Sequence, residues 1–180
     1  TRAWVVYGFI AAAMVVMMTG AVMAATPKIA LVPPGPHPYF APWEQSAKDA
    51  TRDFQVQVDY RVPQSWSLTD QNTLIESLVV QGYNAFGIFP GDPRGTNAII
   101  ETLSNRNIPV VTLAGCTFDP SMALFCMGTD VYESAYVQTK YLIEAIGGSG
   151  NIVHIAGFLT DPYTQLRMRA VEQAVSETDG

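Results

Sequence analysis

The feature that most constrains the fold is a regular alternation of short apolar runs with longer stretches of helical periodicity. Six runs predict strands, because such runs suit strands buried in a sheet: 28–32, 56–62, 85–89, 109–113, 124–127 and 151–156. Five stretches predict helices: 42–54, 67–81, 96–105, 132–146 and 163–176. Strands and helices in this order, joined by short connections, predict an α/β fold with an open parallel sheet and helices on both faces.

A site is expected at one edge of this sheet, because open parallel sheets bind ligands outside the carboxyl ends of their strands. The loops at that edge begin at Pro33, Pro90, Ala114, Gly128 and Gly157. They carry the most unusual local sequences, including a proline-rich aromatic stretch, Gly-Asp-Pro-Arg and Gly-Cys-Thr-Phe. We therefore predict that function lies in these loops.

The first 25 residues have the pattern of a secretory signal peptide. Arg2 precedes an uncharged apolar stretch, and small residues follow, so that cleavage after Ala24 or Ala25 is expected. The alternative is an uncleaved membrane anchor, because about 20 apolar residues span a bilayer. A signal peptide would direct export of the chain to the periplasm, and its cleavage would leave residues 26–180 as the mature protein.

Export bears on the two cysteines, Cys116 and Cys126. In an oxidising compartment they are candidates for a disulfide, and two buried free thiols are the alternative. Two cysteines and two distant histidines lack the spacing of a metal site, so neither a metal nor another cofactor is predicted.

Other function classes are disfavoured by what the sequence lacks. It has no glycine-rich phosphate loop and no nucleophile elbow. Asp92 and Asp161 stand beside prolines, where aspartate is common turn chemistry, so a paired-carboxylate enzyme is not indicated. His154 falls inside a predicted strand and is interpreted as structural. A net charge of -6 without a basic run argues against a nucleic-acid partner.

Several segments, in order and spacing, carry a resemblance to a known family. They are Lys28–Val32 followed by His-Pro-Tyr-Phe, Gly82–Pro90, Asn107–Leu113, the Gly-Thr-Asp at 128–130, and Gly157–Val175. From Lys28 to about Val175 the chain resembles the first lobe of type I periplasmic solute-binding proteins of sugar ABC transporters, especially the ribose-binding branch.

The resemblance implies a two-lobed protein that closes on a small sugar-like ligand and delivers it to the membrane permease of an ABC importer. Residues 26–180 would then be the amino-terminal lobe, and we expect a second lobe after Gly180. The alternative function is an extracellular ligand-sensing domain of a chemoreceptor or histidine kinase, since such sensors share this fold and pocket.

The resemblance also suggests ligand-binding residues. In the family, the turn after the first strand offers a polar residue and two aromatic rings that stack on the sugar. His37, Tyr39 and Phe40 occupy those positions. The alternatives are an exposed loop histidine for His37 and helix-cap packing for the two aromatic residues.

Departures from the family pattern affect specificity. Ala114 and Gly115 stand where the family often has an Asp-Arg pair, and Phe89 replaces an asparagine. The sugar-clamping arginine falls on Gln165, with Arg167 two residues later. A less polar, larger or modified solute is therefore expected. The predicted ligand-binding set is His37, Tyr39, Phe40, Phe89, Asp92, Gly115 and Gln165.

Overall fold

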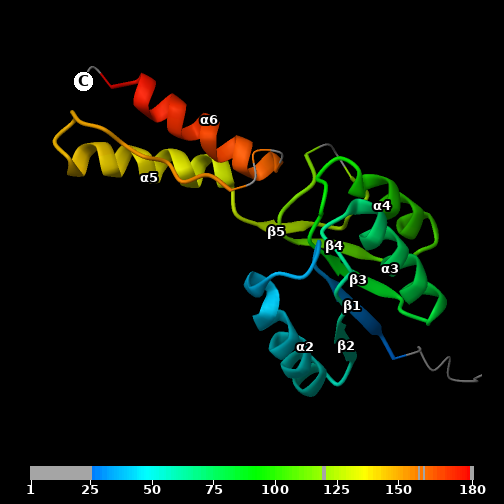
Figure 1. Ribbon diagram of the computed structural model, residues 1–180. Coiled ribbons are helices and arrows are strands. Elements are labelled where there is room, and N and C mark those ends of the chain that lie inside the picture. Colours follow the sequence, from blue (N-terminus) through cyan, green and yellow to red (C-terminus); the bar gives the residue numbers. More distant parts are fainter. Residues whose placement is uncertain (1–25, 119–120, 158, 160, 179–180) are drawn as a thin grey trace, which may run out of the picture.

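The computed structural model describes residues 26–118, 121–157, 159 and 161–178, and the predicted signal peptide lies outside these ranges. Five strands form one parallel sheet in the order β2-β1-β3-β4-β5 (Figure 1). Their bounds are Lys28–Val32, Gln57–Tyr60, Ala85–Ile88, Val110–Ala114 and Cys126–Gly128 for β1 to β5.

Helices cover both faces of this sheet, which confirms the predicted fold class. Helices α3 (Leu68–Val80) and α4 (Thr96–Asn105) cover one face, and α2 (Ala41–Phe54) lies on the other, beside β2 (Figure 1). The opposite placement follows from right-handed crossovers, since the chain moves to β2 on one side of β1 and to β3 on the other.

The main core lies between the sheet and the α3–α4 layer. Ala30 and Val32 of β1 are fully buried there, together with Ile75 of α3 and Ile100 of α4. Alternate strand residues face the other way, where Leu31 and Leu113 meet over Gly87. A Cβ at Gly87 would lie 2.7 Å from Leu113 Cδ1 and 2.9 Å from Leu31 Cδ2, so a larger residue there would require these side chains to move.

The last two helices do not cover the sheet. Helices α5 (Val131–Ala145) and α6 (Pro162–Ser176) pack against each other and extend away from the end of β5 (Figure 1). Each begins at an aspartate N-cap, Asp130 for α5 and Asp161 for α6. The chain therefore builds a sheet layer up to Gly128 and a separate helical pair after it.

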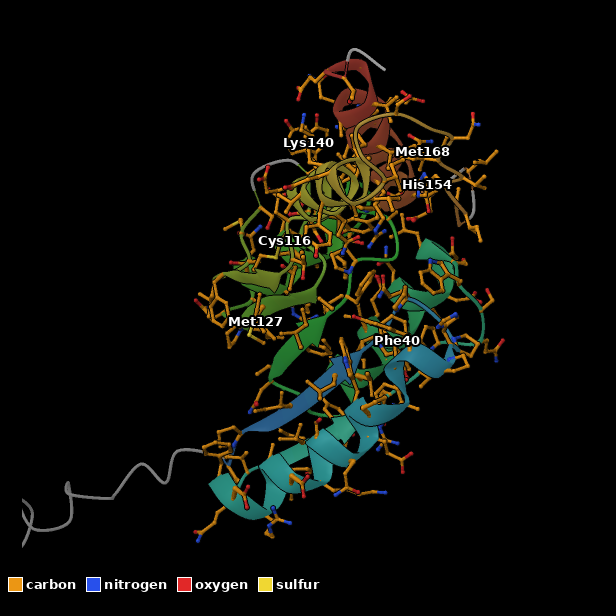
Figure 2. All side chains as sticks on the ribbon, turned by 90° about the vertical axis from the view of Figure 1, so that its left-hand side faces the viewer. Phe40, Cys116, Met127, Lys140, His154 and Met168 are labelled. Carbon is orange, nitrogen blue, oxygen red and sulfur yellow. A yellow bond between two sulfur atoms is a disulfide. The ribbon has the colours of Figure 1, made fainter. Side chains whose placement is uncertain are left out.

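The prediction of a sixth strand at 151–156 is wrong. Residues 151–157 form no regular element, and the side chains of Val153 and Ile155 are 86% and 91% exposed. Figure 2 shows His154 beside the helical pair, away from the strands. A parallel strand needs a neighbouring strand for its hydrogen bonds. This segment runs along α5 and α6, beyond the sheet, so its apolar pattern has no strand to join.

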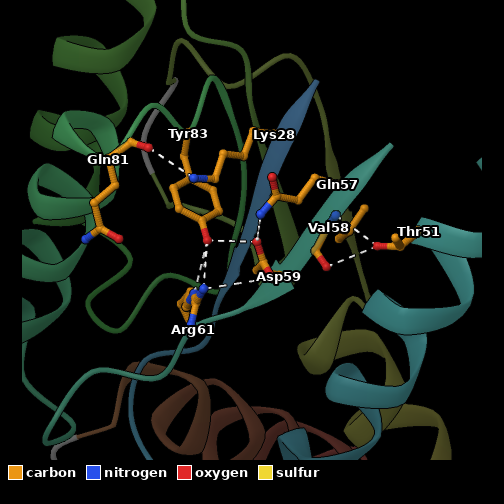
Figure 3. A network of polar contacts seen from close by, with 8 residues as sticks. All are labelled: Lys28, Thr51, Gln57, Val58, Asp59, Arg61, Gln81 and Tyr83. Carbon is orange, nitrogen blue, oxygen red and sulfur yellow. Dashed lines mark hydrogen bonds and ion pairs between the residues drawn. The ribbon is translucent and has the colours of Figure 1, made fainter. Parts of the chain in front are cut away.

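A network of polar side chains lies at the β2 edge of the sheet (Figure 3). The Tyr83 hydroxyl donates to Asp59 Oδ2 over 2.8 Å and accepts from Arg61 Nη2 over 2.9 Å. Burial by itself raises the pKa of Asp59. Hydrogen bonds donated by Tyr83 and Gln57, together with nearby cations, outweigh burial and hold that pKa below its ordinary value of 3.8.

Over the described ranges, no helix combines the length and apolarity needed to cross a bilayer.

Candidate ligand-binding site

A cavity of about 250 Å³ lies where the resemblance placed the ligand, at the carboxyl ends of the strands. Its walls come from the loop after β1, the loop after β2, the ends of β3 and β4, and the first turns of α5 and α6. It is lined by His37, Tyr39, Phe40, Trp66, Phe89, Ala114, Val131, Asp161, Tyr163 and Arg167.

The loop after β1 contributes a buried ring, Phe40, and an exposed ring, Tyr39, to the wall of the cavity. His37 caps the short 3₁₀ turn η1 (Pro38–Phe40), because its Nδ1 accepts from the Tyr39 amide over 3.1 Å. The Phe40 ring is 1% exposed, while the Tyr39 ring is 64% exposed. Figure 2 shows Phe40 just before α2, against the strands. Phe40 therefore acts as packing beneath the site, and Tyr39 offers a free face.

Trp66 is a lining residue that the sequence analysis missed. It lies in the loop after β2 and remains 51% exposed, with its ring centroid 6.2 Å from that of His37 and 6.4 Å from that of Phe89. Gly35 makes this approach possible, because a Cβ there would lie 2.7 Å from Trp66 Cα. An aromatic residue in a loop at the ligand edge was the available signal.

A buried glutamine holds two of the ligand loops together. Gln71 of α3 is fully buried, and its Nε2 donates to the carbonyls of Pro33 over 3.1 Å and Phe89 over 2.7 Å. Its Oε1 accepts from the Gly91 amide over 3.1 Å. Because every bond reaches a loop backbone, this side chain fixes the loop after β1 against the loop after β3.

Tyr163 connects the helical pair to the strand ends. Its hydroxyl donates to the carbonyl of Cys116 over 2.6 Å, and its ring lies between those of Phe89 and Phe118, at 5.9 and 5.7 Å. Burial, with a smaller contribution from Asp161, raises the pKa of Tyr163 to about 12. The hydroxyl therefore keeps its proton and remains a donor at neutral pH.

Cys116, whose carbonyl accepts this bond, is tied to β5 by a disulfide. The structure joins Cys116 to Cys126 with their Cα atoms 5.5 Å apart, which lies within the normal range for a disulfide. The bridge closes the loop that carries Phe118. It therefore restrains both partners of Tyr163 on this side of the cavity.

The N-cap and the second turn of α6 bring one carboxylate and one guanidinium to the cavity. Asp161 accepts from the amides of Tyr163 and Thr164 and from the Thr164 hydroxyl, at 3.3, 2.8 and 2.8 Å. Arg167 lies one turn along the same helix and also lines the cavity. From sequence, Asp161 is expected to be a turn residue, and the family's arginine position falls on Gln165.

The predicted ligand residues are therefore only partly gathered around the cavity. His37, Tyr39, Phe40 and Phe89 line it. The remaining three, Asp92, Gly115 and Gln165, are not among its lining residues.

Those three residues have other contacts. The Asp92 carboxylate accepts from the amides of Arg94 and Gly95, both at 2.8 Å, which makes it a turn residue. The Gln165 amide donates to the carbonyl of Leu159 over 2.9 Å. Gly115 lies behind Tyr163, where a Cβ would be 2.6 Å from the tyrosine oxygen. Their direct contact with a ligand stays a prediction.

Comparison with known proteins agrees with the fold. A family model described as a periplasmic binding protein domain matches residues 29–180. No curated protein sequence matches the chain.

Solved structures with the same fold include a solute-binding protein of an ABC transporter from Burkholderia graminis in complex with D-arabinose, at 20% identity and a TM-score of 0.78. That match covers 86% of this chain and 53% of the other. GanP, a glucose-galactose binding protein from Geobacillus stearothermophilus, matches at 25% identity and a TM-score of 0.72, over 84% and 54% of the two chains.

A periplasmic solute-binding protein from Actinobacillus succinogenes with bound D-allose matches at 21% identity and a TM-score of 0.75, over 86% and 56% of the two chains. The present chain thus spans about half the length of the structures it matches.

Proposed function

This chain belongs to the periplasmic binding protein domain family, and on that footing we propose that it captures a small sugar-like solute for an ABC importer. The family points to a periplasmic or extracellular location, and the signal-peptide pattern of residues 1–25 supports the periplasm. The proposed role is binding and delivery rather than catalysis.

The observation that carries this proposal is a connected group of aromatic rings at the ligand edge of the sheet. Phe40, Phe89 and Tyr163 form a row with successive centroid distances of 5.4 and 5.9 Å, and Trp66 and Tyr39 flank it. Ring faces bind the apolar C–H face of a sugar, and a few placed polar groups then select its substituents.

We propose that this cavity is one wall of a cleft and that a second lobe supplies the other wall. Three observations support this arrangement. Tyr39 and Trp66 present ring area to solvent, the helical pair after β5 projects beyond the sheet, and the matched part of this chain corresponds to only about half of each matched structure. Ligand binding would then close the lobes on each other, and the closed form would dock on the membrane permease.

Titration with monosaccharides tests the binding role. D-arabinose, D-allose, D-galactose and D-glucose are added in turn, and binding is followed by calorimetry and by tryptophan fluorescence. We expect at least one sugar to bind and the Trp66→Ala variant to lose most of that affinity. Phe54→Ala is the matched control, because Phe54 is 75% exposed at the far end of α2. Equal losses in the two variants, or no response to these sugars and to the sugar acids tested below, would contradict the proposal.

A further inference from the structure

Among the side chains that line the cavity, those without a hydrogen-bond partner are mostly hydrogen-bond donors. Within the described part of the chain, neither the Trp66 indole N–H nor the Arg167 guanidinium has a partner, and both residues line the cavity. Tryptophan and arginine side chains donate and never accept. A ligand that satisfies them must bring acceptor oxygens.

His37 adds a third donor. Its Nδ1 accepts the Tyr39 amide, which places the proton of the neutral ring on Nε2. That tautomer offers an N–H beside Trp66, whose ring centroid lies 6.2 Å from that of the histidine.

Two carboxylates near the cavity already accept hydrogen bonds from the first turn of a helix. Asp161 accepts three hydrogen bonds at the start of α6, and Asp130, next to the lining residue Val131, accepts from the amides of Tyr132 and Glu133 at 3.1 and 3.0 Å. Both carboxylates sit at helix N-termini, where the helix dipole offsets part of their negative charge. The Cys116 carbonyl is taken by Tyr163.

A simple aldose matches this set of donors less well than a ligand that carries a carboxylate. Its hydroxyl groups donate as well as accept, and a hydroxyl donor buried without an acceptor costs free energy. Ala114 and Phe89 line the cavity with no side-chain acceptor of their own. Arg167, in contrast, suits a planar carboxylate, which it can bind through two parallel N–H groups.

From this imbalance we infer that the preferred ligand is an acidic sugar or similar cyclic acid, whose ring stacks on the aromatic group and whose carboxylate binds Arg167. The inference rests on the proposed function and narrows it to a ligand class. Arg167 is the residue that determines specificity, and His37 and Trp66 donate to further oxygens of the ring.

Matched pairs of ligands test the inference on the protein by calorimetry at pH 7 and low salt. The probes are D-galacturonate against D-galactose and D-glucuronate against D-glucose, which differ in a carboxylate against a hydroxymethyl group. We expect the acid of at least one pair to bind about tenfold or more tightly than its neutral partner, because charge-assisted hydrogen bonds are roughly twice as strong as neutral ones. High salt should weaken the acid alone.

Two variants test whether Arg167 causes the preference for the acid. Arg167→Gln should reduce the preference for the acid to about threefold or less, because it removes the bidentate charge contact. Arg169→Gln is the matched control, since Arg169 is exposed on the same helix and does not line the cavity; the preference should survive there.

The possible outcomes separate the two proposals. A neutral sugar that binds as tightly as its acid overturns the inference and leaves the binding role intact. A preference for the acid that survives in Arg167→Gln also overturns it. If neither member of either pair binds, the inference fails, and the monosaccharide titration above then decides the binding role separately.

Discussion

Replacing Gly115 by alanine should disrupt the contact that joins α6 to the strand ends. The added Cβ would lie 2.6 Å from the Tyr163 oxygen, whereas ordinary contacts are 3.4–4 Å, so the tyrosine must withdraw by about 1 Å. That shift breaks the 2.6 Å hydrogen bond to the Cys116 carbonyl. Leaving a partly buried hydroxyl and a carbonyl without partners costs about 1–3 kcal/mol.

A double-mutant cycle isolates this effect. Denaturant unfolding is measured for Gly115→Ala, Tyr163→Phe and the double variant. We expect Gly115→Ala to lower the free energy of unfolding by about 1–3 kcal/mol in the native background. In the Tyr163→Phe background the loss should be much smaller, because the clashing oxygen is gone. Equal losses in both backgrounds would refute the reasoning.

Three further predictions concern the supports of the site. Gln71→Leu should leave the Pro33 and Phe89 carbonyls and the Gly91 amide unpaired, and so lower the free energy of unfolding by about 2 kcal/mol or more. It should also speed hydrogen exchange at the Gly91 amide, and an unchanged exchange rate there would contradict the bridging role. Thiol titration of the unreduced protein should find no free thiol, and reducing the Cys116–Cys126 disulfide should lower the free energy of unfolding by about 2–3 kcal/mol; two titratable thiols before reduction would contradict this. The depressed pKa of Asp59 contributes stability above the ordinary pKa of 3.8, which is lost as pH falls through the folded-state value. Acid unfolding should therefore show a steeper loss of stability below about pH 4 in the native protein than in Asp59→Asn, and parallel curves would contradict the assignment.

The sheet, and the edge of the sheet at which the cavity lies, could be predicted from sequence. Apolar runs such as 28–32 and 85–89 signal buried strands, and parallel strand topology sends the loops after Val32 and Ile88 to one edge. These signals are local, so they need no knowledge of which segments meet in space.

Features that depend on distant partners could not be predicted. The pattern at 151–156 has strand character, but a strand forms only where a neighbour offers hydrogen bonds, and here the chain follows the helical pair. Trp66 reaches the site only because Gly35, about 30 residues earlier, lets its backbone approach. Arg167 lines the cavity in place of Gln165 because of helix phase at α6, which the motif alone does not specify.

Ligand-induced chemical shifts, mapped by heteronuclear NMR, would show where a sugar binds on this protein. The protein is titrated with the tightest-binding sugar or sugar acid from the panels above. We expect the largest shifts at His37, Tyr39, Trp66, Phe89 and Tyr163, around the carboxyl ends of β1, β3 and β4. Shifts concentrated elsewhere, for example at the hollow bordered by Val62, Leu74 and Ser77, would contradict the assignment of this cavity as the ligand site.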